Sequence, residues 1–133
     1  MKINDFYFNL RGLRWKVHFV DTCKEVGEFG LKNKIDDESP EAYGITYTHV
    51  QTIVIAKAVS LGYLKVTFFH ELNHAIMDVL RLDGGGQANE EVIVDILASA
   101  YVEVLPQLPK WLVQKSFEGS DGKVLLSFTK GDK

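Results

Sequence analysis

The stretch Thr67-Phe68-Phe69-His70-Glu71-Leu72-Asn73-His74-Ala75-Ile76 decides how the rest of this 133-residue chain is interpreted. Two histidines four residues apart on a helix lie about one turn from each other on the same face, so that their imidazole rings can converge on one ion. Glu71 lies next to the first histidine, where a carboxylate can handle the proton of a metal-bound water without serving as a ligand. The alternative is a chance spacing of two surface histidines, and a helical context favours the metal site over it.

The surrounding sequence predicts that context, a helix from near Leu61 to Leu82. Ser60 is expected to cap its start, and Gly84 is expected to end it. Apolar residues recur at helical spacing and predict the buried face of the helix, namely Leu64, Phe68, Leu72, Ala75 and Val79. A polar line follows one edge of that face, as is typical of a helix beside a cleft, and it consists of Thr67, His70, His74 and Asp78.

Composition indicates one ordinary globular domain spanning residues 1–133, with 46% apolar and 25% charged residues. The net charge of −3 and the absence of a basic block argue against a nucleic-acid surface. Cys23 is the single cysteine, which excludes an internal disulfide and a cysteine-rich zinc ribbon. The chain shows no secretion signal and no apolar stretch of membrane-spanning length. We therefore expect a cytoplasmic protein that does not interact with a membrane.

Alternating apolar and polar residues predict a small β-sheet. The segment Leu13–Phe19 has a period of two and predicts a half-buried strand, with His18 on its solvated face. Phe6-Tyr7-Phe8 is either a short strand or an arm that covers the core. Tyr43–Thr48 and Thr52–Ala56 predict two adjacent antiparallel strands, although no Gly or Pro marks the turn between them. The expected fold is α+β, an antiparallel sheet of about three strands packed on two core helices.

Further helices are expected on both sides of these strands. A short helix is possible around Thr22 to Phe29, and a strong helix is predicted from Asn89 to about Leu105, ended by Pro106. From about residue 110 the chain is expected to be less ordered or to form a β-hairpin. There Trp111-Leu112-Val113 should pack back on the core, and Val124–Thr129 is apolar enough for one more strand.

Two histidines cannot hold a catalytic zinc alone, so a third protein ligand has to come from another element. Glu90 and Glu91 open the second helix, where the helix dipole also stabilises carboxylates. Glu91 is the favoured ligand, and Glu90 is the second choice. Asp95 follows Glu91 by one turn on the same face and can orient a ligating imidazole as an outer partner. The small residue Ala98, another turn along, would allow this helix to approach the first one closely.

Several of these segments together resemble the compact gluzincin-type metallopeptidases of the ImmA/IrrE family, which are common in phages and mobile elements. The resemblance spans about residues 43–105 and is carried by Tyr43-Gly44-Ile45-Thr46, Gln51–Ile55, His70–Ile76 and Glu90–Asp95. It implies that His70 and His74 bind zinc, that Glu71 is the catalytic base, and that a glutamate of the second helix is the third ligand. It also implies an edge strand along which an extended protein or peptide substrate can lie.

The chain departs from this family in two ways. It has no room for the helix-turn-helix domain that many relatives carry, and its second helix lacks the Ala-x-x-Phe-Ala run of the repressor-cleaving members. The SprT-like proteases have a similar helix but usually add a cysteine zinc ribbon, which the single cysteine excludes.

The sequence therefore predicts a zinc peptidase in which Glu71 acts as general base. A helper proton donor is expected, and the unranked candidates are Tyr43, Tyr47, His49 and Tyr101. One alternative is a metal-binding interaction protein of phage or mobile-element origin that has no peptidase turnover. Another is an α+β scaffold without a metal.

Overall fold

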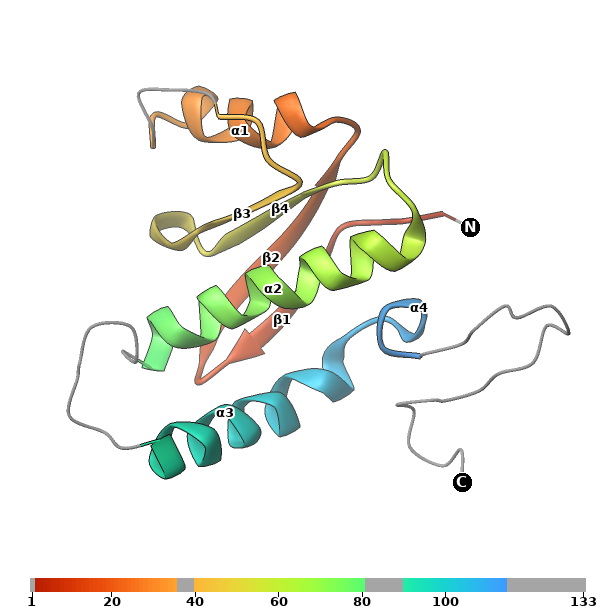
Figure 1. Ribbon diagram of the computed structural model, residues 1–133. Helices are drawn as coiled ribbons and strands as arrows, with labels where there is room; N and C mark the ends of the chain where they lie inside the picture. Colours follow the sequence, from red (N-terminus) through yellow and green to blue (C-terminus); the bar gives the residue numbers. More distant parts are fainter. Residues whose placement is uncertain (1, 36–39, 81–89, 115–133) are drawn as a thin grey trace, which may run out of the picture.

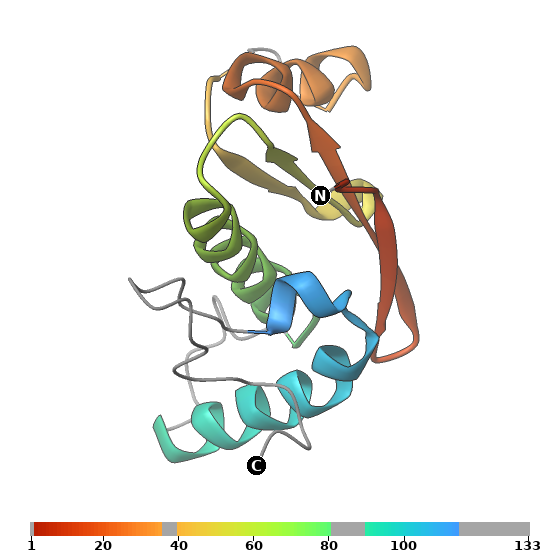
Figure 2. The same cartoon turned by 90° about the vertical axis from the view of Figure 1, so that its right-hand side faces the viewer.

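The computed structural model describes residues 2–35, 40–80 and 90–114, except for the side chain of Glu90. They form three layers, with a four-stranded sheet between helix α1 on one face and helices α2 and α3 on the other (Figures 1 and 2). The elements in chain order are β1 (Phe6–Leu10), β2 (Leu13–Val20), α1 (Cys23–Lys32), β3 (Gly44–Tyr47), the 3₁₀ turn η1 (Thr48–Val50), β4 (Thr52–Ala56), α2 (Leu61–Leu80), α3 (Glu90–Val104), the 3₁₀ turn η2 (Leu105–Gln107) and α4 (Lys110–Val113). The predicted α+β class is confirmed.

The sheet has the strand order β1-β2-β4-β3, and it differs from the expected antiparallel sheet of about three strands by having four strands and one parallel pairing. β1 and β2 form an antiparallel hairpin whose two loop residues, Arg11 and Gly12, have φ values of 52° and 83°. Positive φ at both positions is typical of a type I′ turn. β2 and β4 pair in parallel, because β3 starts at the end of the sheet where β2 finishes and runs back antiparallel, so that β4 again follows the direction of β2. The sheet is therefore mixed.

The predicted antiparallel pairing of the third and fourth strands is confirmed, with Gly44 opposite Ile55 and Tyr47 opposite Thr52. The connection has neither Gly nor Pro. Gln51 follows η1 with φ 49° and ψ 51°, so it adopts the left-handed conformation that the reversal requires. A non-glycine residue in this region is uncommon, which explains why the turn could not be located sharply from the residue types alone. β3 lies at the edge of the sheet, next to α2.

The core lies mainly between the sheet and α2. The alternation predicted in β2 is confirmed, since Trp15, Val17 and Phe19 are all buried. β4 is buried along its whole length because it is a central strand covered on both faces. Its residues Ile53 and Ile55 belong to the core beneath α2, whereas Val54 and Ala56 pack in the smaller core beneath α1.

The N-terminal segment is fixed to the sheet by Asp5. Phe6-Tyr7-Phe8 is part of β1 and not a separate arm. The carboxylate of Asp5 accepts hydrogen bonds from the backbone N–H of Phe19 at 2.9 Å and from His18 Nδ1 at 2.7 Å. Burial raises the pKa of Asp5, but these hydrogen bonds and the positive charges of His18 and Lys16 outweigh it and lower the pKa below 3.8. The partly exposed His18 therefore has a structural partner.

The helices begin where capping side chains are available. α1 follows a capping box, in which Thr22 and Glu25 bind each other's backbone N–H groups, so the expected short helix is confirmed. At the start of α2, the Ser60 hydroxyl accepts from the N–H of Tyr63 at 3.2 Å, as predicted. Within the described residues, no helix is both long and apolar enough to span a membrane.

The C-terminal part of the described chain packs as expected. Pro106 lies in η2, immediately after α3 ends. In α4, Leu112 is buried and the ring of Trp111 lies 6.0 Å from that of Phe19. The predicted end of the first helix at Gly84, its continuation to Leu82, the cap at Asn89 and the strand Val124–Thr129 lie outside the described residues.

Candidate metal centre and adjoining pocket

The two histidines of the motif lie on the exposed side of α2, and their imidazole rings converge. His70 Nε2 and His74 Nε2 are 3.3 Å apart. In a tetrahedral zinc site with Zn–N bonds of about 2.0–2.1 Å, two nitrogen ligands lie about 3.3 Å apart. The same separation also allows an N–H···N hydrogen bond between the rings. The pair therefore has the spacing that a shared zinc ion requires.

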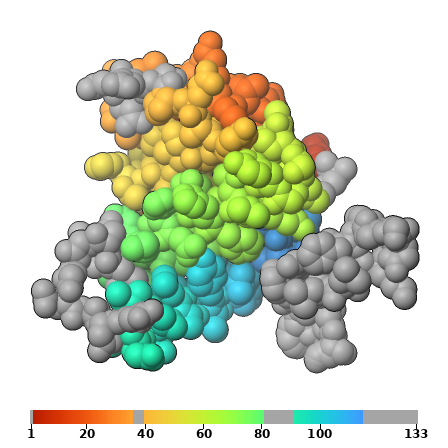
Figure 3. All heavy atoms as spheres, viewed as in Figure 1, coloured from red at the N-terminus to blue at the C-terminus, as the bar shows by residue number. Residues whose placement is uncertain are grey.

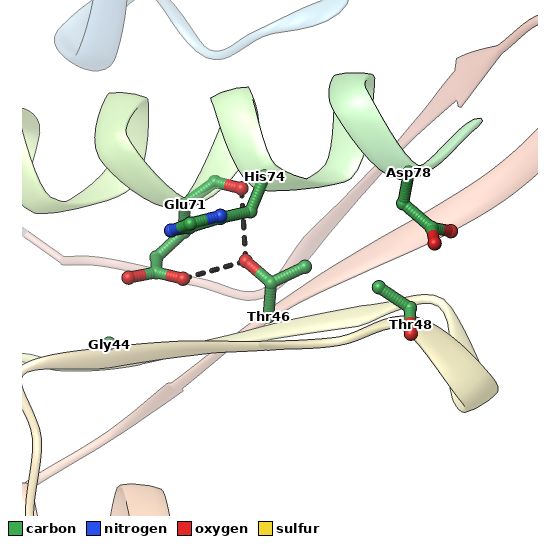
Figure 4. A pocket seen from close by; sticks show the side chains of 6 residues that line it. All are labelled: Gly44, Thr46, Thr48, Glu71, His74 and Asp78. Atoms are coloured by element: carbon green, nitrogen blue, oxygen red, sulfur yellow. Dashed lines mark hydrogen bonds between the residues drawn. The ribbon is translucent and has the colours of Figure 1, made fainter. Parts of the chain in front are cut away.

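The carboxyl group of Glu71 lies next to this pair but faces the sheet. Its side chain is only 9% exposed, and Oε2 is 4.0 Å from His70 Nε2. Thr46, on the neighbouring strand β3, places its hydroxyl 2.7 Å from Glu71 Oε1 and 2.9 Å from the backbone carbonyl oxygen of the same residue (Figure 4). The Thr46 hydroxyl thus contacts both the carboxyl group and the backbone carbonyl of Glu71. The predicted base is thus held beside the histidines by a residue from another element.

Close packing of β3 on α2 makes this contact possible, and Gly44 makes the packing possible. A Cβ atom at Gly44 would lie 2.8 Å from Thr67 Cγ2 and 3.0 Å from Glu71 Cγ. Both distances are at or below the limit of ordinary contacts, so a larger residue would push the strand and helix apart. The absence of a side chain at this position therefore sets the distance between the sheet edge and Glu71.

A pocket of about 450 Å³ opens between β3 and α2. Figure 3 shows the two elements side by side on one face of the molecule, and Figure 4 shows the side chains from both that line the pocket. The lining residues are Gly44, Thr46, Thr48, Glu71, His74 and Asp78. The lining residues from β3 and η1, namely Gly44, Thr46 and Thr48, are every second residue of the chain, because alternate residues of a strand face the same side. Two residues of the predicted polar line of α2, His74 and Asp78, therefore line the pocket, whereas Thr67 and His70 do not.

The third ligand is the part of the predicted site that the structure does not assemble. Among the described residues, no three His, Cys, Asp or Glu side chains lie close enough together to hold one metal ion. Glu91 and Asp95 are exposed on α3, and the side chain of Glu90 lies outside the described part of the chain. The assignment of Glu91, with Glu90 as second choice and Asp95 as the outer partner, stays a prediction.

The contact between α2 and α3 differs from the one expected. Ala98 is exposed and does not mediate a close approach. Instead, the hydroxyl of Tyr101 donates to Asn73 Oδ1 at 2.5 Å. Tyr101 follows Glu91 by ten residues, which correspond to about 15 Å along a helix. The described contact thus lies beside the histidines, and the start of α3 lies far along the helix from it.

The four candidates for a helper proton donor are no longer equivalent. Tyr47 is buried and its hydroxyl donates to the carbonyl oxygen of Val26, on the α1 side of the sheet, so it does not serve the pocket. Burial raises the pKa of Tyr101, whose hydroxyl is hydrogen-bonded to Asn73 on α2. Tyr43 immediately precedes β3 and His49 follows it in η1, and both are exposed. Tyr43 and His49 are thus the two candidates beside the ends of the strand that lines the pocket.

Sequence reasoning missed Thr46 and Gly44 as site residues. The available signal was their alternation with Ile45 and Tyr47 in a predicted strand, which places them on one face. That pattern does not show which helix the face meets. Comparison of the chain with protein-family models, with curated proteins and with solved structures finds no match in any of the three. The resemblance to the ImmA/IrrE metallopeptidases therefore depends on the motif residues alone.

Proposed function

We propose that this protein is a zinc-dependent peptidase that hydrolyses a peptide bond of a protein or peptide substrate in the cytoplasm. The observation that carries the proposal is the 3.3 Å separation of the His70 and His74 Nε2 atoms beside the buried carboxyl group of Glu71. The chemistry of the donors supports zinc, since paired imidazoles with one carboxylate ligand are a common catalytic set for this ion. His70 and His74 would hold the metal, and the proposed third ligand is Glu91, or Glu90 as second choice, although the described position of α3 does not bring Glu91 to the histidines.

When bound, zinc supplies a water of lowered pKa and a Lewis acid that polarises a carbonyl oxygen. The role of Glu71 in the proposal is to accept a proton from the attacking water and to pass it to the departing amine. Thr46 holds the Glu71 carboxyl group in place before the substrate arrives. A preorganised base needs no reorientation during the reaction, which lowers the barrier.

The position of β3 supports a peptide as the substrate. β3 is an edge strand, and the pocket follows it from Gly44 to Thr48. An extended peptide can add to such an edge through main-chain hydrogen bonds, while its alternate side chains enter the adjoining pocket. The scissile bond would then lie along α2, within reach of Glu71.

A second candidate function is metal-dependent binding of a partner protein without turnover, in a protein of phage or mobile-element origin. The observation that favours it is that the described residues bring together two candidate metal ligands, His70 and His74, but not three. In this case the pocket would bind its partner whether or not Glu71 is intact. A scaffold without metal is a third possibility, and elemental analysis of protein purified without added metal separates it from the other two.

The variant Glu71→Gln tests the proposal, because it keeps the shape of the side chain and removes the base. We expect it to bind zinc in the same stoichiometry as the wild type and to lose about 10²- to 10⁴-fold in turnover. Glu28→Gln, on α1 at the other face of the sheet, is the matched control and should keep full activity. Equal turnover in Glu71→Gln and the control would remove Glu71 from the mechanism.

A further inference from the structure

Two tyrosines form a wall at the Gly44 end of the pocket. Tyr43 immediately precedes β3, and Tyr63 lies in the first turn of α2. Their ring centroids are 4.8 Å apart in an edge-to-face arrangement that bridges the strand and the helix. Each residue is 47% exposed, although both are large and aromatic. Tyr43 is the chain neighbour of the lining residue Gly44, so the pair presents an aromatic surface beside the pocket that the described part of the chain leaves about half exposed.

The position of this wall can be compared with the length of an extended peptide. Tyr63 precedes His70 by seven residues, which place it two turns away on the same face of α2 and about 10 Å along the axis. An extended peptide rises about 3.3 Å per residue, so this distance corresponds to about three residues. A peptide lying along β3 with its reacting bond at the histidines would thus place a side chain against the two tyrosines.

The charge of the pocket limits the chemistry of that peptide further. Its lining includes two carboxyl groups, Glu71 and Asp78, and neither Lys nor Arg. Acidic side chains close to the cleaved bond would be repelled, whereas neutral or basic ones would be accepted. Aromatic rings of the wall gain contact area with another aromatic or large apolar side chain at little entropic cost.

We propose that the Tyr43–Tyr63 wall is a specificity subsite, which selects extended peptides with an aromatic or large apolar side chain about three residues from the cleaved bond. Acidic residues in the intervening positions are disfavoured. This inference rests on the proposed peptidase function for the position of the cleaved bond. The existence of the binding surface itself does not depend on hydrolysis.

A set of quenched-fluorescence decapeptides tests the inference. The peptides share a background of Gly, Ser and Lys and differ only in the position of a single Phe. With the zinc-loaded protein, we expect mass spectrometry to find the cut about three residues from Phe, always on the same side, and to follow Phe as it moves. Cuts that ignore the position of Phe would overturn the proposal.

Separate variants Tyr43→Ala and Tyr63→Ala assign the preference to the wall. Each should lower kcat/KM for the Phe peptides about tenfold, as is common for a buried tyrosine at an interface. Tyr7→Ala is the matched control, since Tyr7 is 48% exposed and lies on β1 at the opposite edge of the sheet. It should leave the rates unchanged. An undiminished Phe preference in both wall variants would refute the assignment.

Binding of the same peptides to Glu71→Gln, followed by fluorescence anisotropy of a labelled set, separates this inference from the proposed function. If the zinc-loaded wild type cuts no peptide, but the Phe peptides bind and their binding depends on Tyr63, the wall is a recognition site and the peptidase proposal fails. If peptides are cut without a preference for Phe, the peptidase proposal holds and the subsite does not. Equal binding of peptides with and without Phe to the wild type and both wall variants would also refute the subsite.

Discussion

Replacing Thr46 with valine removes one hydroxyl group and keeps the shape of the side chain. In the wild type this hydroxyl is 2.7 Å from Glu71 Oε1 and 2.9 Å from the Glu71 carbonyl oxygen. The Glu71 side chain is 9% exposed, so water cannot freely replace the lost donor. Leaving a buried polar group without its partner costs about 1–3 kcal/mol. We therefore expect Thr46→Val to lose about 1–3 kcal/mol of unfolding free energy.

Thr46→Ser is the matched variant, since it keeps the hydroxyl and removes only a methyl group. For this partly buried position, we expect a loss of less than about 1 kcal/mol. Urea unfolding followed by tryptophan fluorescence measures the loss of stability in both variants. The m-value should stay constant, because the surface that becomes exposed on unfolding does not change. In peptide hydrolysis, Thr46→Val should lower kcat with little change in KM, because it disturbs the base and not the groove.

Two results would refute this reasoning about Thr46. One is a valine variant that is as stable and as active as the wild type, which would mean that Glu71 needs no partner from β3. The other is a serine variant that loses as much as the valine variant, which would assign the effect to the methyl group. Zinc content should be equal in all three proteins, because Thr46 is not a proposed ligand.

Three further predictions concern the packing, the pH dependence and the third ligand. Gly44→Ala should lose about 1–3 kcal/mol in urea unfolding, because the new methyl group would lie 2.8 Å from Thr67 Cγ2; wild-type stability would show that the strand and helix separate easily. Asp5 has a lowered pKa, so its contribution to stability is present above pH 3.8 and is lost as the pH falls through the lower folded value. Asp5→Asn should therefore be less stable than the wild type at pH 7, and the gap should close in more acidic urea titrations; a constant gap would contradict this. Glu91→Ala should lower zinc content measured by mass spectrometry more than Glu90→Ala does, and the reverse order would make Glu90 the ligand.

Local patterns in the sequence predicted most of the individual elements. The period of two in β2, the apolar stripe of α2 and the cap at Ser60 can all be recognised from residues close in the chain, and the structure confirms them. The parallel pairing of β2 with β4 was not predicted. It depends on the connection through α1 entering β3 at the end of the sheet where β2 finishes, and no short stretch of sequence encodes that route.

The candidate site also has features that could be predicted from the sequence and features that could not. The convergence of His70 and His74 follows from helical geometry and could be predicted from their spacing alone. The roles of Thr46 and Gly44 could not, because they arise where two elements about 25 residues apart in the chain meet. The identity of the third ligand cannot be predicted from a local pattern either, since its position depends on how α3 packs against α2.

The most direct test of the account is anomalous diffraction at the zinc absorption edge from crystals grown with zinc. A zinc site on the histidine pair should give one strong peak within bonding distance of the Nε2 atoms of His70 and His74. We also expect a carboxylate from the start of α3 as the third protein ligand, and the Glu71 carboxyl group next to the ion but not bound to it. A histidine pair without a peak, or a peak whose other protein ligands leave no position open for water, would contradict the account.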